Sequence, residues 1–177
     1  EILQSIALAF QGDALGFEPS YSMHPLITRA VGKRWISVPR DAQFNIELDS
    51  AVAAIESSKP GIVFITTPNN PTGGSTSLEN ISRIAAAARE KNAIVVVDAT
   101  FATPLRQNPL QMGADIVLHS GTKMIGGHSD LLMGIAIATS GEHATFLATH
   151  RHDHGATPGS LETFLTLRGL RTLSVRL

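Results

Sequence analysis

Five polar residues follow short apolar segments of the chain, at the points where a parallel sheet would present them to a ligand. They are Asn70, Asp98, Ser120, Thr122 and Lys123. A lysine amine attacks carbonyl carbons, a carboxylate can serve a metal ion, a ribose hydroxyl or a protonated ring nitrogen, and hydroxyls in a glycine-rich loop can hold a phosphate. Each also has a plain structural interpretation, because Asp and Asn form caps and turns and a lone lysine in such a loop is usually solvated.

Two other features suggest chemistry less specifically. Tyr21 is the only tyrosine, and it could stack on a flat ligand, although packing is the commoner role of a lone loop tyrosine. The segment 150–154 reads His-Arg-His-Asp-His, but we expect a solvated loop there and predict no metal site. The sequence contains neither Gly-x-Ser-x-Gly nor Gly-x-Gly-x-x-Gly, so it predicts neither a serine nucleophile elbow nor a Rossmann nucleotide site.

The apolar pattern alternates between short β-rich runs and helical periodicity. It predicts strands over 14–17, 35–38, 62–65, 94–97, 115–119 and 133–138, and helices over 24–31, 48–58 and 78–91. Near-continuous apolar strands are typical of a parallel sheet that helices cover on both faces. We therefore predict one α/β domain over residues 1–177, with a parallel or mixed sheet flanked by helices. Ligands of such sheets bind beyond the carboxyl ends of the strands.

Composition excludes several classes of protein. Hydrophobic residues make up 43% and charged residues 16% of the 177 residues, which excludes a disordered tail. The net charge of −1 gives no electrostatic basis for binding nucleic acid or an acidic membrane. With no cysteine the chain has no disulfide framework and no thiol nucleophile, and it suits a reducing cytoplasm. The apolar runs are too short for a membrane span.

Both ends of the sequence read as helices without caps, and there is no initiator methionine. We therefore expect a fragment or a truncated gene product. A chimera is the alternative.

In chain order, the five polar residues match the needs of pyridoxal phosphate, which requires a lysine for the Schiff base, a carboxylate against its ring nitrogen, and donors to its phenolate and phosphate oxygens. The chain resembles the large domain of fold type I pyridoxal-phosphate enzymes, the aspartate aminotransferase-like fold, with the small domain missing. This resemblance implies that Lys123 binds the cofactor and then shuttles the proton. It further implies that Asp98 faces the ring nitrogen and that Asn70 bonds the phenolate oxygen.

The same resemblance implies roles for the remaining residues. Ser120 and Thr122 would bind the cofactor phosphate, and Tyr21 would stack on its ring. The substrate would be a small amino acid, and the full-length relatives would be homo-oligomers.

Two branches of this superfamily are similar to different parts of the chain. Residues 1 to about 80 resemble histidinol-phosphate aminotransferases of class I/II, through the segments Glu1–Gln4, Phe17–His24 and Thr67–Gly73. Residues from about 94 resemble the cystathionine γ-synthase/γ-lyase family, through the segments Val97–Pro104, Gly113–Lys123, Gly126–Asp130, Gly155–Gly159 and Leu167–Leu173.

Departures from the two patterns set the functional expectation. Phe101 stands where class I/II aminotransferases carry a tyrosine, and no arginine occurs in the stretch 124–134 where they bind phosphate. Two residues also depart from the cystathionine γ-synthase/γ-lyase pattern. Ala99 stands where that family usually has an asparagine, and Met124 where it usually has an aromatic residue. We expect trans-sulfuration chemistry, γ-elimination or γ-replacement on an amino acid. The alternatives are amino transfer, as in histidinol-phosphate aminotransferase, and a catalytically inert fragment.

Overall fold

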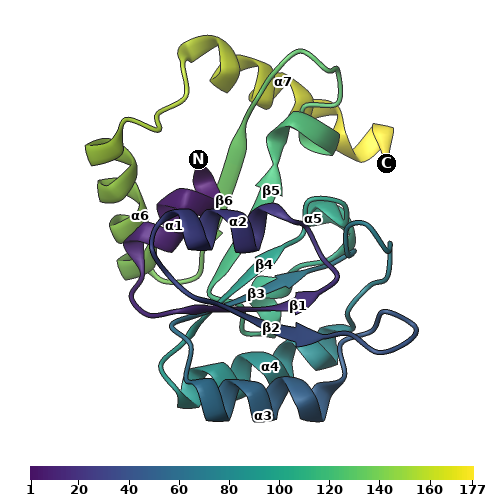
Figure 1. Ribbon diagram of the computed structural model, residues 1–177. Helices are drawn as coiled ribbons and strands as arrows, with labels where there is room; N and C mark the ends of the chain where they lie inside the picture. Colours follow the sequence, from purple (N-terminus) through teal and green to yellow (C-terminus); the bar gives the residue numbers. More distant parts are fainter.

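Six strands form one sheet between two layers of helices (Figure 1). The structure is a computed structural model that describes residues 1–177. The strand order is β2-β1-β3-β4-β5-β6, and all neighbours are parallel except β6, which runs antiparallel to β5 at the sheet edge. The strands are β1 (Ala14–Glu18), β2 (Trp35–Pro39), β3 (Ile62–Thr66), β4 (Ile94–Asp98), β5 (Ile116–Ser120) and β6 (Gly134–Ala138).

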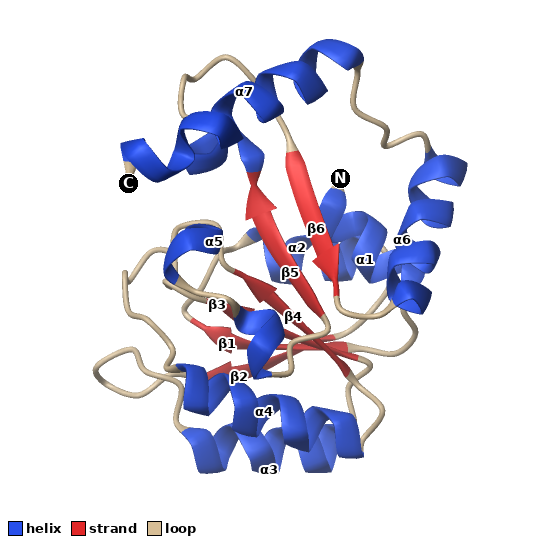
Figure 2. Cartoon of the chain, turned by 180° about the vertical axis from the view of Figure 1, so that it is seen from behind, coloured by secondary structure: helices blue, strands red, loops and turns tan.

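Seven α-helices and two shorter helical turns surround this sheet, and Figure 2 shows the same layers from behind. None of the helices is both long enough and apolar enough to cross a membrane. The helices are α1 (Ile2–Ala9), α2 (Met23–Ala30), α3 (Leu48–Ser58), α4 (Leu78–Glu90), α5 (Thr103–Arg106), α6 (Gly141–His154) and α7 (Ser160–Arg176), and the turns are η1 (Pro109–Met112) and η2 (Gly121–Ile125).

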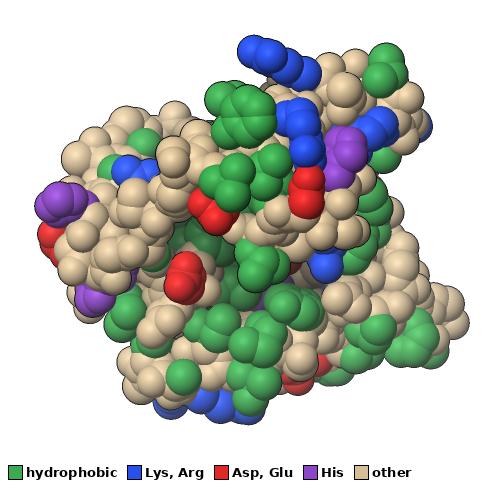
Figure 3. All heavy atoms as spheres, turned by 90° about the horizontal axis from the view of Figure 1, so that it is seen from above, with side chains coloured by type: hydrophobic (Ala, Val, Ile, Leu, Met, Phe, Trp, Pro, Cys, Tyr) green, Lys and Arg blue, Asp and Glu red, His purple; other side chains and the backbone are tan.

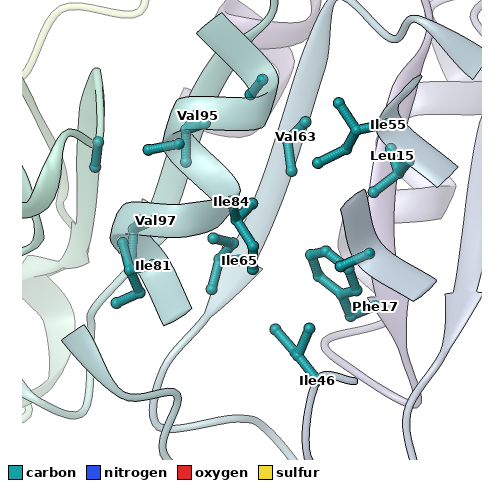
Figure 4. Close-up of a cluster of buried hydrophobic side chains, with 14 of the residues drawn as sticks. Leu15, Phe17, Ile46, Ile55, Val63, Ile65, Ile81, Ile84, Val95 and Val97 are labelled. Atoms are coloured by element: carbon teal, nitrogen blue, oxygen red, sulfur yellow. The ribbon is translucent and has the colours of Figure 1, made fainter. Parts of the chain in front are cut away.

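Helices α3 and α4 cover one face of the sheet and enclose the larger core. In Figure 4, Ile81 and Ile84 of α4 point toward the sheet valines and isoleucines, and Ile55 of α3 lies over Val63. These side chains are fully buried. The helical spacing of α4 thus places one apolar face against the odd-numbered side chains of β3 and β4.

Helices α1 and α6 contribute to a smaller core on the opposite face. Ile6 of α1 is buried there with Ile62, Phe64 and Val96, and Leu147 of α6 packs against the cluster at its margin. Because successive strand residues point to opposite faces, β3 and β4 are apolar along their whole length. The mixed sheet covered on both faces confirms the predicted fold class.

The predicted elements form where the sequence pattern placed them, with ends that move by one residue or two. Two shifts matter for function, because Asp98 and Ser120 are the last residues of their strands rather than the first residues of loops. The loop predicted over 150–154 is wrong. These residues form the last turns of α6, which ends at Gly155 in the left-handed conformation that favours glycine.

Truncating the centre of the sheet should destabilise the chain strongly. Ile65 of β3 is fully buried between the layers, so Ile65→Ala removes apolar contacts and leaves a cavity. We expect a loss of about 2–5 kcal/mol in the free energy of unfolding, measured by urea denaturation. Ile137→Ala on β6 is the matched control, since its side chain is 41% exposed, and it should cost much less. Equal losses in the two variants would contradict the assigned core.

Candidate active site

The candidate site lies at the edge where the carboxyl ends of the parallel strands meet. After β1 the chain places β2 on one side and β3 on the other, so the strand order reverses between β1 and β3. Such a reversal leaves a crevice at the strand ends, where α/β sheets bind ligands. Tyr21 follows β1, Asn70 follows β3, and Lys123 follows β5, so all three lie at this edge.

Three strand-terminal side chains share one face of the sheet at this edge. Thr66 pairs with Asp98, and Asp98 pairs with Leu118, two residues before Ser120. Because side chains alternate along a strand, Thr66, Asp98 and Ser120 point to the face that α1 and α2 cover. The Ser20 hydroxyl donates to Thr66 Oγ1 at 3.1 Å and ties the loop after β1 to this row.

Hydrogen bonds fix the Asp98 carboxylate relative to β5. Its Oδ1 accepts from the Thr100 amide at 3.0 Å, and Thr100 Oγ1 in turn accepts from the Ser120 amide at 2.8 Å. Asp98 Oδ2 accepts no hydrogen bond and faces His24 Nε2 at 3.9 Å. One carboxylate oxygen is therefore anchored, and the other is available to a cationic donor.

His24 belongs to the site, although the sequence alone did not single it out. Its imidazole is buried and stacks on the Phe64 ring, with centroids 5.0 Å apart and planes 11° apart, while Tyr21 meets it edge-on at 5.5 Å. Burial lowers the pKa of His24, and the nearby Asp98 carboxylate opposes this effect only partly. Its position three residues after Tyr21, at the start of α2, was the only sequence signal.

Two adjacent asparagines divide structural and functional roles. Asn69 is buried, its Nδ2 donates to Pro19 O and Thr72 Oγ1 at 3.0 and 2.7 Å, and its Oδ1 accepts from Arg40. Asn70 is half-buried and its side chain makes no hydrogen bond. Asn69 therefore holds the loop, and Asn70 keeps an amide free for a ligand.

Lys123 lies in the turn η2 directly after β5, and its side chain is exposed. Its Nζ stands 5.7 Å from the centroid of the Phe101 ring and forms no ion pair. The Thr122 hydroxyl accepts from the Met133 amide at 3.0 Å but retains its own proton to donate. The turn therefore places an unpaired amine and a hydroxyl donor beside the end of β5.

A cavity of about 400 Å³ lies between α1, β6 and α6, away from this edge. None of the six predicted site residues lines it. The structure also gathers no group of three or more His, Cys, Asp or Glu side chains that could hold a metal ion. Figure 3 shows one face of the molecule, on which hydrophobic side chains gather around a hollow with acidic side chains beside it.

The free groups at the edge fit pyridoxal phosphate. Asp98 offers an unbonded carboxylate oxygen, Lys123 an unpaired amine, and Asn70 an unused amide. These are the groups that a pyridine aldehyde needs at its ring nitrogen, its carbonyl carbon and its phenolate oxygen.

Comparison with known proteins points the same way. A family model described as Cys/Met metabolism PLP-dependent enzyme matches residues 24–177. The histidinol-phosphate aminotransferase of Thermobifida fusca is 43% identical over 153 residues, 85% of this chain and 40% of the relative. The cystathionine gamma-synthase of Escherichia coli is 43% identical over 129 residues, 73% of this chain and 33% of the relative. The resemblance to the aminotransferase was suggested by residues 1 to about 80, and the resemblance to the synthase by residues from about 94. Both matched stretches are longer than these parts, so the two stretches overlap.

Solved structures share the fold. An apo methionine gamma lyase from Micromonospora echinospora superposes with a TM-score of 0.85 and 29% identity, over 98% of this chain and 46% of that protein. A cystathionine gamma synthase from Xanthomonas oryzae pv. oryzae, in complex with aminoacrylate and cysteine, superposes with a TM-score of 0.83 and 34% identity. This match covers 98% of this chain and 44% of that protein. The chain spans less than half the length of these relatives.

Acid should destabilise the fold through His24. Because burial holds its pKa below the ordinary 6.5, the unfolded chain binds the proton first as the pH falls. The stabilising contribution of the neutral ring is therefore complete above about pH 7 and is lost as the pH falls from there toward the lowered pKa. His24→Phe keeps a ring against Phe64 and should shrink the difference between the unfolding free energies at about pH 7 and pH 4.5 by about 1–3 kcal/mol.

His152→Phe, at an exposed position of α6, is the matched control and should leave that difference unchanged. His119, whose pKa burial also lowers, is present in both variants and cancels in the comparison. Urea denaturation at the two pH values measures the effect. An unchanged pH dependence in His24→Phe would show that the ring is not held neutral by the fold.

Proposed function

The chain belongs to the Cys/Met metabolism PLP-dependent enzyme family, and from this membership we propose that residues 1–177 form a single cofactor-binding unit of an enzyme that acts on amino acids. The proposed reaction is of the trans-sulfuration type, γ-elimination or γ-replacement. We place this unit in the cytoplasm and in a homo-oligomeric full-length enzyme.

Each proposed role follows from the chemistry of the residue. Bound pyridoxal phosphate supplies an electron sink for the charge that develops when a bond at the substrate Cα breaks. Lys123 would hold the cofactor through Nζ and would also be the base that takes the proton from the substrate Cα. The Asp98 carboxylate would keep a proton on the ring nitrogen, and the Asn70 amide would donate to the phenolate oxygen.

The phosphate and the ring faces have their own contacts in this proposal. The hydroxyls of Ser120 and Thr122 would donate to phosphate oxygens, and the Tyr21 ring would cover one face of the cofactor. The observation that carries the proposal is the Thr100 bridge, because it fixes an anchored carboxylate at the end of β4 next to the strand that leads to an unpaired lysine.

Two departures from the aminotransferase pattern favour trans-sulfuration. Phe101 lacks the hydroxyl of the tyrosine expected there, and its ring instead lies beneath the Lys123 amine. The stretch 124–134 offers no arginine for the cofactor phosphate. The long similarity to a histidinol-phosphate aminotransferase keeps amino transfer as the second candidate.

The lysine assignment predicts a spectroscopic result. The purified chain mixed with pyridoxal phosphate should develop a yellow absorbance band that borohydride converts to a stable covalent adduct at Lys123. Lys123→Arg keeps the positive charge but cannot form the bond, so it should lose both the band and the adduct. Lys59→Arg, at an exposed position after α3, is the control and should behave as the unsubstituted chain. An adduct that persists in Lys123→Arg would refute the assignment.

Substrate assays separate the candidate reactions. With O-succinylhomoserine and cysteine, a trans-sulfuration enzyme should consume both substrates and form a thioether product. With histidinol phosphate and 2-oxoglutarate, an aminotransferase should form glutamate. Turnover confined to the second pair would replace the proposed reaction by amino transfer, and no turnover with a normal absorbance band would identify a unit that binds cofactor without completing catalysis.

A further inference from the structure

Helix α7 packs unusually closely against the turn that carries Lys123. Its inward side holds Thr166, Gly169 and Leu173, all buried. A Cβ atom added at Gly169 would stand 2.2 Å from the Ile125 carbonyl oxygen and 2.7 Å from that of Gly126. No side chain fits such a gap against backbone, so the glycine allows helix and turn to touch directly.

Arg176, about two helical turns after Gly169 along α7, binds the same turn through its guanidinium group. Nη1 donates to the Met124 carbonyl at 2.9 Å, and Nη2 donates to the carbonyls of Ile125 and Gly169 at 3.1 and 2.8 Å. Nε donates to Thr172 Oγ1 at 3.0 Å, which fixes the guanidinium plane. Gly127 leaves room for this group, since a Cβ there would meet Arg176 Nη1 at 2.1 Å.

The carbonyls of Met124 and Ile125 accept no backbone hydrogen bond from the residues that follow the turn. Within η2, the Gly126 amide donates to Gly121 O and the Gly127 amide donates to Lys123 O, both at 2.7 Å. Met124 O and Ile125 O remain at the carboxyl end of the turn, where carbonyl dipoles carry partial negative charge and favour a cation. Arg176 supplies that cation from a residue 52 positions away along the chain.

Thr122 is tied to Met133, the residue before β6, through the Met133 amide and carbonyl, whereas the lysine side chain has no polar partner. The Lys123 backbone departs from helical geometry inside the turn, at φ −91° and ψ −117°, and its exposed side chain forms no hydrogen bond or ion pair, with Nζ 5.7 Å from the centre of the Phe101 ring. The direction in which the amine leaves the sheet edge is therefore set by the backbone of the turn. A reacting amine must be held to within a fraction of an ångström of its productive position, so the conformation of this backbone determines whether the amine can react.

We propose that Arg176 is a positioning residue for Lys123, and that α7 acts as a clamp on the lysine turn through Arg176 and the glycine contact at position 169. The proposal rests on the function assigned to Lys123 above. Arg176 does not touch the reacting atoms. It joins two backbone carbonyls and the helix so that the turn keeps one conformation.

Hydrogen exchange without cofactor tests the clamp itself. Arg176→Met keeps the length of the side chain but loses the donors, so the amides of Gly126 and Gly127 should exchange about tenfold faster. Arg171→Met, an exposed position of the same helix, is the matched control and should not change exchange in the turn. Arg176→Lys should recover only part of the protection, because an ammonium group does not span the carbonyls as a planar fork does.

The absorbance band that forms with pyridoxal phosphate then tests whether the clamp affects the reactivity of Lys123. In Arg176→Met the affinity for pyridoxal phosphate, titrated by absorbance, should fall about tenfold, with a smaller fall in Arg176→Lys and none in Arg171→Met. Gly169→Ala gives an independent variant. Its methyl group has no room against the Ile125 carbonyl, so it should displace the turn from α7 and weaken cofactor capture, as Arg176→Met does.

The two measurements separate the possible failures. Unchanged exchange and an unchanged band in Arg176→Met would overturn the clamp. Faster exchange with an unchanged band would show that the clamp orders the turn but does not position the lysine, and would also overturn the proposal. If the unsubstituted chain gave no band, the proposed function would fail, and the claim that Arg176 positions a reactive lysine would be refuted with it, whereas the exchange result would still report the contact.

Discussion

The hydrogen bond from the Ser120 amide to the Thr100 hydroxyl is the interaction on which the candidate site most depends. Thr100 also anchors Asp98 through its own amide, so one residue connects the carboxylate at the end of β4 with the strand that leads to the lysine turn. The parallel pairing of β4 with β5 brings the two ends together and sets the face to which Asp98 points, but it leaves the rotamer of the carboxylate free. The threonine fixes that carboxylate relative to the end of β5, where the lysine turn begins.

Most of the fold could be predicted because a sheet that is buried on both faces requires strands with consecutive apolar residues, a pattern that is easily recognised in the sequence. Strands such as Ile94–Asp98 are apolar at consecutive positions, and α4 repeats its apolar residues with helical spacing. Helix α6 shows no such pattern, since it buries none of its residues fully and its two large apolar side chains, Phe146 and Leu147, are adjacent instead of spaced along one face. Its histidine-rich end therefore read as a loop, although the helix begins with a serine cap and ends with a left-handed glycine.

The site divides in a similar way between local and distant signals. Asp98, Asn70 and Lys123 could be selected as candidates because each lies at or just after the end of a strand and because their order matches a known chemistry. His24 and Arg176 could not, because each acts on a residue far away in the chain, the first on Asp98 and the second on the Met124 carbonyl. The roles of Asn69 and Asn70 were likewise inseparable until their hydrogen bonds distinguished the buried residue from the free one.

The two edges of the sheet differ in how they meet solvent. Strand β2 ends in Pro39, which offers no backbone N–H, and Trp35 and Ser37 bind Glu18 on the neighbouring strand. Strand β6 consists of glycine, alanine and isoleucine, with no charge or proline to discourage pairing. An uncharged edge of this kind is a template for a strand from another molecule. A lysine introduced on β6 would give this edge the charge that it lacks.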